Sequence, residues 1–561
     1  MCQHLDAGMG PDCSHRGPDG SAAAVAGPYR FRFHQLNVVL PQQPGHGATQ
    51  PLTQGRKTLV CNGEIYNAEV SEGASDCMAL FDVVGEQAPI QRAGPYRILQ
   101  RIAACSQLRG EYAFVMVDEE SQTLWAGRDQ FGVRPMYQAH CSVCDRLCFA
   151  SEAVCFKGPF RCGVARALDV RQFKPNTLLE LPYATDPVGP KSAEQRLHRG
   201  SREPREQTIH WWNPAPPTKN AWVTFLDAVR VRVGGNLEGG TTQVGILLSG
   251  GIDSGALLVA CSQLGFGPRC IAFTQQLRSA LEADTEDVRL ATALAKELGI
   301  AHRVYKDTPL AALKAVPEVV DAIASYDTTT VRASTPAFLL CRHIRQDYPA
   351  IRVLLCGEGA DELFGGYQYF RHAPDVHHAA AESERLLGDL HGTDIRRVCG
   401  TAGASGFEVR PAYLDRDFVH CVTSVPDEER FGGLAEVEKK WWRDICATQA
   451  PAGSTFEKVV KRAKEAFSDG VGHGWVDLLR NGTATGEETP GGDAWLARAS
   501  RNYRHVPPRT KEALWYRKLF EDHYGPERET LVSHMWMPAP WASVGDPHDP
   551  SARALVGYRS T

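Results

Sequence analysis

A glycine-rich segment at residues 249–254 (SGGIDS) carries the residue types that bind a phosphate. It follows an apolar run at 243–248 that indicates a buried strand, and it precedes a helical pattern at 254–264. Gly250 and Gly251 would let backbone N–H groups approach a ligand closely, and a helix N-terminus favours an anion. The lysine of a Walker-type loop is missing, so the segment predicts a phosphate site of another kind.

Two carboxylates accompany this expected phosphate site. Asp253 could face a phosphate only through a cation, and Mg²⁺ bound by one or two carboxylates and phosphate oxygens supplies one. Asp361 and Glu358 lie in a second glycine-rich turn at 356–362 (CGEGADE), directly after an expected strand at 351–355. Because open α/β sheets bind ligands at the carboxyl ends of their strands, we predict Asp253 and Asp361 as Mg²⁺ ligands. Glu358 is a candidate to orient or deprotonate an attacking amine.

Two further charged residues admit simpler interpretations. Glu362 is well explained as part of a solvated acidic loop. Lys464, in the segment 464–472 (KEAFSDGVG), could neutralise charge on a transferring phosphoryl or adenylyl group, although a lone lysine is usually just exposed.

The elements that would position these residues divide the chain in two. Residues 1–190 hold short β-type runs broken by Gly and Pro, at 31–39, 58–61, 112–117 and 123–127, which indicates a strand-rich domain. Residues 184–219 are rich in Pro, Arg, Glu and Lys and predict a connector. Beyond it, expected strands at 243–248, 270–273 and 351–355 alternate with helical patterns at 254–264 and 286–299. That alternation predicts a doubly wound α/β sheet.

Composition excludes several classes of function. The 561 residues allow more than one domain, and 61 Lys and Arg against 66 Asp and Glu leave a net charge of −5. Proteins that bind nucleic acid or a membrane surface usually carry a basic excess, so neither partner is expected. The 17 scattered cysteines favour a reducing compartment over a disulfide framework. With neither a signal-peptide pattern nor a long apolar stretch, a cytoplasmic protein is expected.

Taken together, these segments resemble the glutamine-hydrolysing asparagine synthetases. SGGIDS, CGEGADELFGGY and KEAFSDGVG match in order and spacing, as do YDTTTVRAS at 326–334, SHMWMP at 533–538 and DPSAR at 549–553. The resemblance covers nearly the whole chain and looks most like the eukaryotic enzymes. It implies an N-terminal glutaminase sandwich (αββα) at 2–190, a connector at 191–218, a doubly wound ATP-pyrophosphatase domain at 219–545 and a tail at 546–561.

The resemblance also implies a two-step reaction. The side-chain carboxylate of aspartate attacks the α-phosphorus of ATP, which gives β-aspartyl-AMP and pyrophosphate. Ammonia then attacks the acyl carbon and releases asparagine and AMP. ATP is thus a substrate, Mg²⁺ is the expected cofactor, no organic cofactor is implied, and the family suggests a homodimer.

Site residues carry over by motif. In the family, the first loop cradles pyrophosphate, and the residues matching it here are Ser249, Gly250, Gly251, Asp253 and Ser254. The adenosine site would be lined by Leu248, Phe273, Cys356 and Gly357. Glu358 would serve the aspartyl-adenylate step, and Arg332 and Lys464 would balance its phosphate charge.

A glutaminase site is implied in the N-terminal domain. Removal of Met1 would expose Cys2 as the nucleophile, with its own α-amino group as base. Asn62 and Gly63 match the family's oxyanion hole, and Asp76 matches the acid that holds the amino group of glutamine. The expected glutamine-binding set is Gln35, Asn62, Gly63, Glu64 and Asp76.

Some features depart from the family. The segment between Cys2 and His15 is short, and neutral Gln35 replaces an arginine that would clamp the α-carboxylate of glutamine. A basic residue expected near Gly400 is missing, although Arg397 lies one turn away. These departures leave open an ammonia-dependent synthetase with a degenerate glutaminase domain. A non-catalytic relative, or an enzyme that adenylylates another acid as β-lactam synthetases do, are further alternatives.

Overall fold

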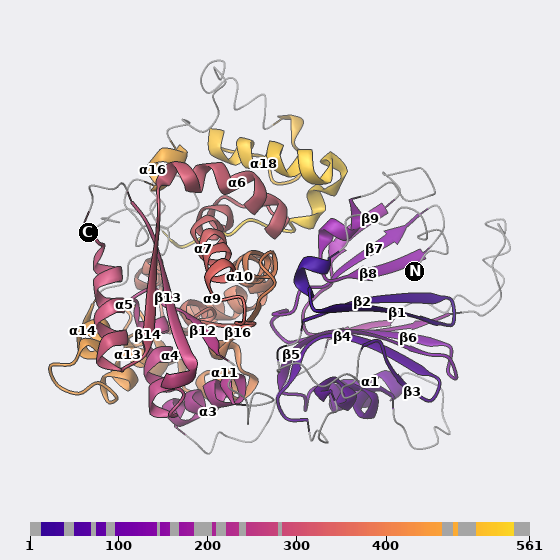
Figure 1. Ribbon diagram of the computed structural model, residues 1–561, viewed down its shortest axis with the longest axis horizontal. Helices are drawn as coiled ribbons and strands as arrows, with labels where there is room; N and C mark the ends of the chain where they lie inside the picture. The colour runs from indigo at the N-terminus through magenta and orange to yellow at the C-terminus, as the bar shows by residue number, and fades with distance from the viewer. Residues whose placement is uncertain are drawn as a thin grey trace. The chain divides into compact units, whose positions relative to one another are not determined.

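The chain forms two compact units, residues 1–37 with 41–213 and residues 38–40 with 214–561, each described here by itself (Figure 1). The computed structural model describes residues 13–36, 38, 50–68, 75–85, 96–142, 146–157, 168–183, 205–208, 220–234, 243–278, 283–462, 475–480 and 501–542. Most of the predicted connector lies outside these residues. Its residues 205–208 form strand β11 (Arg205–Thr208), which pairs with the sheet of the first unit.

The first unit is built around a six-stranded antiparallel sheet in the order β11-β10-β6-β5-β4-β3. Its strands besides β11 are β3 (Leu52–Gln54), β4 (Lys57–Ile65), β5 (Gly110–Asp118), β6 (Thr123–Arg128) and β10 (Thr177–Pro182). Strand β5 is apolar on both faces, because Tyr112, Phe114 and Met116 pack into one core and Ala113, Val115 and Val117 into another. Both faces of the sheet must therefore be covered.

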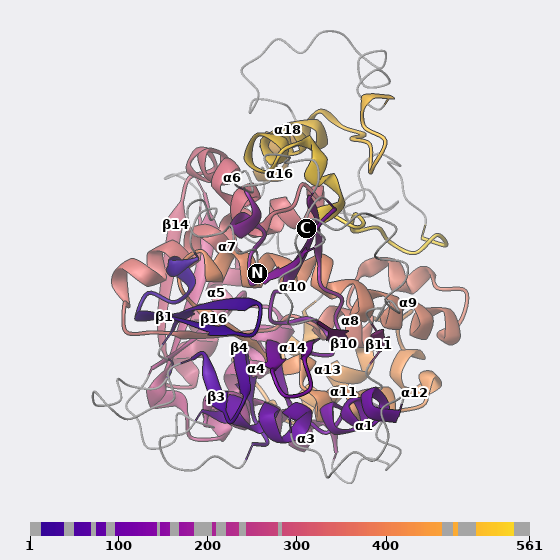
Figure 2. The same cartoon turned by 90° about the vertical axis from the view of Figure 1, so that its right-hand side faces the viewer.

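Helix α1 (Tyr96–Cys105) covers one face, where Ile102 and Cys105 join the core around Phe114. The other face packs against a hairpin of β1 (Gly20–Ala26) and β2 (Tyr29–Gln35) and against β8 (Arg146–Ala150), β7 (Tyr137–Cys141) and β9 (Leu168–Gln172). Figures 1 and 2 show this layering of strands and helix. The predicted strands at 58–61, 112–117 and 123–127 are confirmed, and the one at 31–39 ends at Gln35.

The second unit holds a five-stranded parallel sheet in the order β14-β13-β12-β15-β16, as the alternating pattern predicted. Its strands are β12 (Val244–Leu247), β13 (Cys270–Leu277), β14 (Ala301–Asp307), β15 (Val353–Cys356) and β16 (Glu408–Pro411). The sequence pattern had indicated β12, β13 and β15 but neither edge strand. β14 is polar and partly exposed, and β16 is short and contains Arg410 and Pro411.

The order of strands creates a switch point beside β12. The chain proceeds from β12 to β13 and β14 on one side and then crosses back to place β15 and β16 on the other. Helices α4 (Ile252–Gln263) and α5 (Glu286–Glu297) pack on β12, β13 and β14, whereas α7 (Thr328–Asp347) and α10 (Asp394–Gly403) pack on β13 and β16. Because right-handed crossovers that run in opposite directions lie on opposite faces, the sheet is covered on both sides.

Further helices surround this sheet. Helix α18 (Lys511–Tyr524) lies on α6 (Pro309–Ile323) and α7, beside α16 (Trp475–Arg480) (Figures 1 and 2). Among the described residues, no helix combines the length and apolar character needed to cross a membrane. The other helices are α3 (Ala221–Val233), α8 (Ala360–Phe364), α9 (Val376–Asp389), α11 (Arg416–Thr423), α12 (Asp427–Phe431), α13 (Lys440–Ala447) and α14 (Thr455–Lys461).

A buried ion pair joins α3 to the start of α11. Arg232 donates to Asp415 at 2.7 Å, and the two side chains are 1% and 0% exposed. The second carboxylate oxygen of Asp415 caps α11 by accepting from the backbone of Asp417 and Phe418. Asp415 thus compensates a buried charge and begins a helix at once.

Asp415→Ala should lower the free energy of unfolding by about 3–5 kcal/mol, because it leaves Arg232 buried without its carboxylate and removes the cap. Urea-induced unfolding measures the change. Asp417→Ala is the matched control: that side chain is 42% exposed and pairs with Arg416, so about 0.5 kcal/mol or less is expected. Equal effects of the two substitutions would contradict the assignment.

Candidate functional site

The loop after β12 is shaped as a phosphate-binding turn. Gly250 adopts a φ of +89°, and a methyl group there would lie 2.3 Å from the carbonyl oxygen of Asp287, so only glycine fits. The hydroxyl of Ser254 accepts from the backbone N–H of Ser249 at 3.1 Å and lies 3.0 Å from the Ser249 hydroxyl. Helix α4 begins directly after Gly251, so its N-terminus adjoins the loop.

The turn after β15 meets this loop at the switch point of the sheet. Strands β12 and β15 are paired, and Gly357 packs so closely on α4 that an added methyl group would lie 3.1 Å from the Asp253 Cβ atom. Gly359 has a φ of +94°, which turns the chain sharply into α8. The two predicted motifs, far apart in the sequence, therefore lie side by side at the carboxyl end of the sheet.

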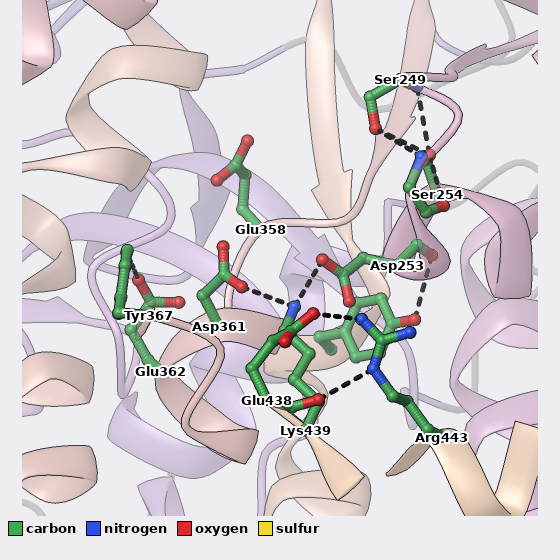
Figure 3. Close-up of polar contacts among 12 residues, drawn as sticks. Ser249, Asp253, Ser254, Glu358, Asp361, Glu362, Tyr367, Glu438, Lys439 and Arg443 are labelled. Carbon is green, nitrogen blue, oxygen red and sulfur yellow. Dashed lines mark hydrogen bonds and ion pairs between the residues drawn. The ribbon is translucent and has the colours of Figure 1, made fainter. Parts of the chain in front are cut away.

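A buried lysine links the two predicted metal ligands. The Lys439 Nζ atom lies 2.5 Å from Asp253 Oδ2 and 2.5 Å from Asp361 Oδ1 (Figure 3). The lysine side chain is 0% exposed, whereas those of Asp253 and Asp361 are 21% and 24% exposed. Three charged groups from three segments thus form one cluster whose carboxylates reach solvent.

The two carboxylates suit a divalent cation. Carboxylate oxygens are the ligands that Mg²⁺ prefers, and phosphate oxygens usually complete its coordination. The Asp253 Oδ1 atom is buried and has no hydrogen-bond partner among the described residues, so it has acceptor capacity to spare. Asp253 and Asp361 could therefore hold Mg²⁺ beside the phosphate loop.

Glu358 lies in the same turn and is held by a guanidinium. Arg397 of α10 donates to Glu358 at 2.7 Å and to Asp394 at 2.8 Å. Burial raises the pKa of Glu358 to about 7, although the charge of Arg397 opposes the shift. A carboxyl group with such a pKa can exchange a proton near neutral pH, which suits general acid–base chemistry.

Glu362 corrects one expectation from the sequence. It does not belong to a solvated loop, because helix α8 turns it inward and leaves it only 3% exposed. Tyr367 donates its hydroxyl hydrogen to Glu362 at 2.5 Å. Burial, together with the carboxylates of Asp394 and Asp361, raises the pKa of Glu362 to about 8.

Comparison with known proteins agrees with this geometry. The family model described as "Asparagine synthase" matches residues 227–398 and 374–543, more than half of the chain. That of the "Glutamine amidotransferase domain" matches residues 36–158. The asparagine synthetases [glutamine-hydrolyzing] of Rattus norvegicus and Homo sapiens are 30% and 31% identical, each over 98% of this chain and 95% of the relative. The probable asparagine synthetase of Acanthamoeba polyphaga mimivirus is 30% identical over 97% of this chain and 95% of its own.

The chain belongs to the glutamine-hydrolysing asparagine synthetase family. Among solved structures, the glutamine phosphoribosylpyrophosphate amidotransferase from B. subtilis with ADP and GMP is 17% identical over 52% of this chain and 60% of its own. Its TM-score of 0.25 is too low to bear on the fold.

The residues that the family places around adenosine lie in or directly after the central strands β12, β13 and β15. Leu248, Phe273 and Cys356 are each 2% exposed or less, and Leu248 donates its backbone N–H to the carbonyl oxygen of Phe273. The Phe273 ring packs edge-on against Tyr348 at 5.1 Å. These three side chains are therefore core residues.

Arg332, matched to a phosphate-balancing arginine of the family, is fully engaged within the protein. Its guanidinium donates two hydrogen bonds to the Glu512 carboxylate, at 2.8 and 2.5 Å, and the two side chains are 3% and 2% exposed. The Arg332 carbonyl oxygen also accepts from the Trp475 indole at 3.4 Å. The pair ties α7 to α18.

The matched glutaminase residues gather on β4 and the turn that follows it. Gly63 has a φ of +146°, and a methyl group there would lie 2.0 Å from the Glu111 carbonyl oxygen. Asp76 is 7% exposed and accepts from the Ile65 backbone N–H, so it lies beside the end of β4. Asn62 and Glu64 flank Gly63 on the same strand.

Other matched residues lie elsewhere or outside the description. Gln35 ends β2, where its carbonyl oxygen accepts from Asp19 N–H at 3.0 Å. Cys2 and Lys464 both lie outside the described residues. The sequence alone had missed Lys439, because nothing in the run VEKKWW separates it from the adjacent Lys440. The only local signal, a left-handed backbone at φ 57°, is visible in the structure alone.

The free energy of unfolding should depend on pH through Glu362. A raised carboxyl pKa means that the folded protein binds the proton more tightly than the unfolded chain does. This stabilisation is complete below the unfolded value of 4.5 and is lost as the pH rises to about 8. In metal-free buffer, Glu362→Gln should therefore gain stability over the wild type between pH 5 and pH 8, on the order of 3 kcal/mol. Urea unfolding at both pH values tests this, and an unchanged difference between the proteins would contradict it.

Proposed function

We propose that this protein makes L-asparagine from L-aspartate, ATP and an ammonia donor, through a β-aspartyl-AMP intermediate. One observation carries the proposal: the loop at 249–254 and the turn at 356–362 adjoin at the switch point of the parallel sheet, with Asp253, Asp361 and Glu358 at their junction. The relatives of this chain at 30–31% identity are named asparagine synthetases [glutamine-hydrolyzing].

In this proposal the phosphate loop and the α4 N-terminus bind the pyrophosphate end of ATP through backbone N–H groups. Asp253 and Asp361 hold Mg²⁺, which neutralises charge on the phosphates when it is bound. The adenosine site takes in Leu248, Phe273, Cys356 and Gly357. Fixing the nucleotide here leaves its α-phosphorus open to attack by the aspartate carboxylate, and the bond to pyrophosphate then breaks.

Glu358 has a role in the second step. Ammonia attacks the acyl carbon, the bond to AMP breaks, and the nitrogen must lose a proton. The Glu358 carboxyl group can take that proton, because its pKa of about 7 leaves a large fraction ionised at neutral pH. Arg397, which lies on α10, holds the Glu358 carboxylate in place through a hydrogen bond. By motif, Arg332 and Lys464 are assigned to balance phosphate charge, and for Arg332 this role requires that its guanidinium leave Glu512.

The first unit supplies ammonia in this proposal. Cys2 attacks the amide carbon of glutamine, and Asn62 and Gly63 stabilise the oxyanion that forms. Gln35, Glu64 and Asp76 complete the glutamine site. The tight fit at Gly63 supports the assignment, because it holds the backbone of β4 in a conformation open only to glycine. We further propose that the glutaminase and synthetase parts span 2–190 and 219–545, and that the protein is a cytoplasmic homodimer.

A second candidate is an ammonia-dependent synthetase. One observation favours it: Gln35 brings no positive charge to the α-carboxylate of glutamine. Under this alternative the first unit is a remnant scaffold and the second unit keeps its chemistry.

Asparagine formation from aspartate and Mg·ATP, with glutamine or ammonium in parallel reactions, separates the two. We expect product with both nitrogen sources, and Cys2→Ala should abolish only the glutamine reaction. Product with ammonium alone would establish the remnant scaffold. If neither source gives asparagine, the proposed function is wrong.

Gly250→Ala should weaken Mg·ATP binding at least about tenfold, because the added methyl group collides with the Asp287 backbone and displaces the loop. Gly265→Ala is the matched control. Gly265 also has a positive φ, of +76°, but its added methyl group would meet nothing within 4 Å. It should cost about 1 kcal/mol of stability and leave ATP binding intact. Calorimetric titration measures both, and intact binding in Gly250→Ala would refute the loop assignment.

A further inference from the structure

The cluster around Lys439 has a feature that the proposed chemistry does not use. A lysine this deeply buried needs compensation, and Asp253 and Asp361 provide it from two different loops. Since Nζ lies 2.5 Å from an oxygen of each carboxylate, the two oxygens are no more than twice that distance apart. Without a cation between them, like charges at such a separation would repel.

The backbone around Lys439 is organised to keep the ammonium in place. Lys439 adopts a left-handed conformation with φ 57° and ψ 28° at the start of α13, which lysine rarely does. Its neighbour Glu438 is buried and held by Arg443 of α13 and by Arg371. Arg443 and Arg371, by holding Glu438, therefore fix the direction of the Lys439 side chain.

The fit around the ammonium is close. A methyl group at Gly366 would lie 2.0 Å from Asp361 Oδ1 and 2.2 Å from Lys439 Cε, so glycine is required there. On the other side, the Tyr413 hydroxyl donates to the Asp253 carbonyl oxygen at 3.0 Å. Figure 3 shows Nζ between the two carboxylates, with the Glu438 and Arg443 pair beneath it.

We propose that Lys439 is a positioning residue of the adenylylation site. Its ammonium occupies the space between Asp253 and Asp361, holds the two carboxylates at a fixed separation, and leaves Asp253 Oδ1, a buried atom that has no hydrogen-bond partner among the described residues, for Mg²⁺ that arrives with ATP. The inference rests on the proposed function, because that function supplies the metal. Lys439 also keeps the pair of carboxylates from acting as a strong metal site before the nucleotide is present.

This role predicts two effects of opposite sign. Lys439→Met removes the competing charge, so the nucleotide-free protein should bind Mn²⁺, used alone as the probe, about tenfold more tightly or better. The same variant should slow aspartate-dependent ATP–pyrophosphate exchange at least about tenfold, because the two carboxylates are no longer held at a fixed separation. A purely structural role would weaken metal binding and exchange together.

Lys440→Met is the matched control, because the adjacent Lys440 is 31% exposed and pairs with Asp444. It should leave Mn²⁺ affinity and exchange unchanged. Calorimetry or the electron paramagnetic resonance of Mn²⁺ reads the affinity, and thermal unfolding reports whether each variant folds. Unchanged or weaker Mn²⁺ binding in folded Lys439→Met would overturn the proposal.

If Lys439→Met does not fold, Gly366→Ala decides, because it keeps every charge while its methyl group would collide with both Lys439 Cε and Asp361 Oδ1 and so disturb the contact between them. Gly433→Ala is its control, since an added methyl group there would lie 2.4 Å from a side-chain carbon of the half-buried Lys440. Slower exchange in Gly366→Ala alone supports the proposal, and equal exchange in both variants overturns it. Mn²⁺ binding needs neither aspartate nor ATP, so it remains informative even if the wild type makes no asparagine.

Discussion

Two carboxylates of like charge have to be held together at one end of a parallel sheet, and much of the second unit is arranged around that requirement. Asp253 lies in the first turn of α4 and Asp361 in the first turn of α8, and the pairing of β12 with β15 brings the two segments to one place. A buried lysine from the start of α13 then neutralises part of their charge. Moving any of the three segments would leave a charge buried without its partner. The electrostatics of the site therefore depend on the packing of the domain.

Exposure and partners distinguish the acidic residues of a single turn, although burial raises the pKa of both Glu358 and Glu362. Glu358 is partly exposed and pairs with Arg397, whereas Glu362 is buried beside Tyr367, with other carboxylates nearby. One is therefore suited to exchange protons with a bound substrate, and the other to pack the turn from within. The contacts of each side chain thus decide whether it serves chemistry or packing. Such differences are expected because charge–charge interactions are stronger in the low dielectric of the protein interior.

The first unit combines a well-packed sheet with a change of charge at the expected glutamine site. Its sheet is covered on both faces, and Gly63 packs closely on the backbone of Glu111. Gln35, however, ends β2 as a neutral side chain where the family has an arginine, whereas Asp76 matches the family's acid and accepts from the backbone of β4.

Local sequence patterns predicted the class of each unit, the three central strands β12, β13 and β15, and the two glycine-rich motifs at the carboxyl end of the sheet, because apolar periodicity and glycine-rich turns are local signals. Tertiary structure alone decided the edge strands β14 and β16, which are polar or short, and the burial of Glu362. It also decided the partners of two cations: Arg332 forks onto Glu512 of α18, and Lys439 rather than Lys440 reaches the carboxylates. Ion pairs between residues far apart in the chain follow from where the backbone carries them, and no local pattern encodes that.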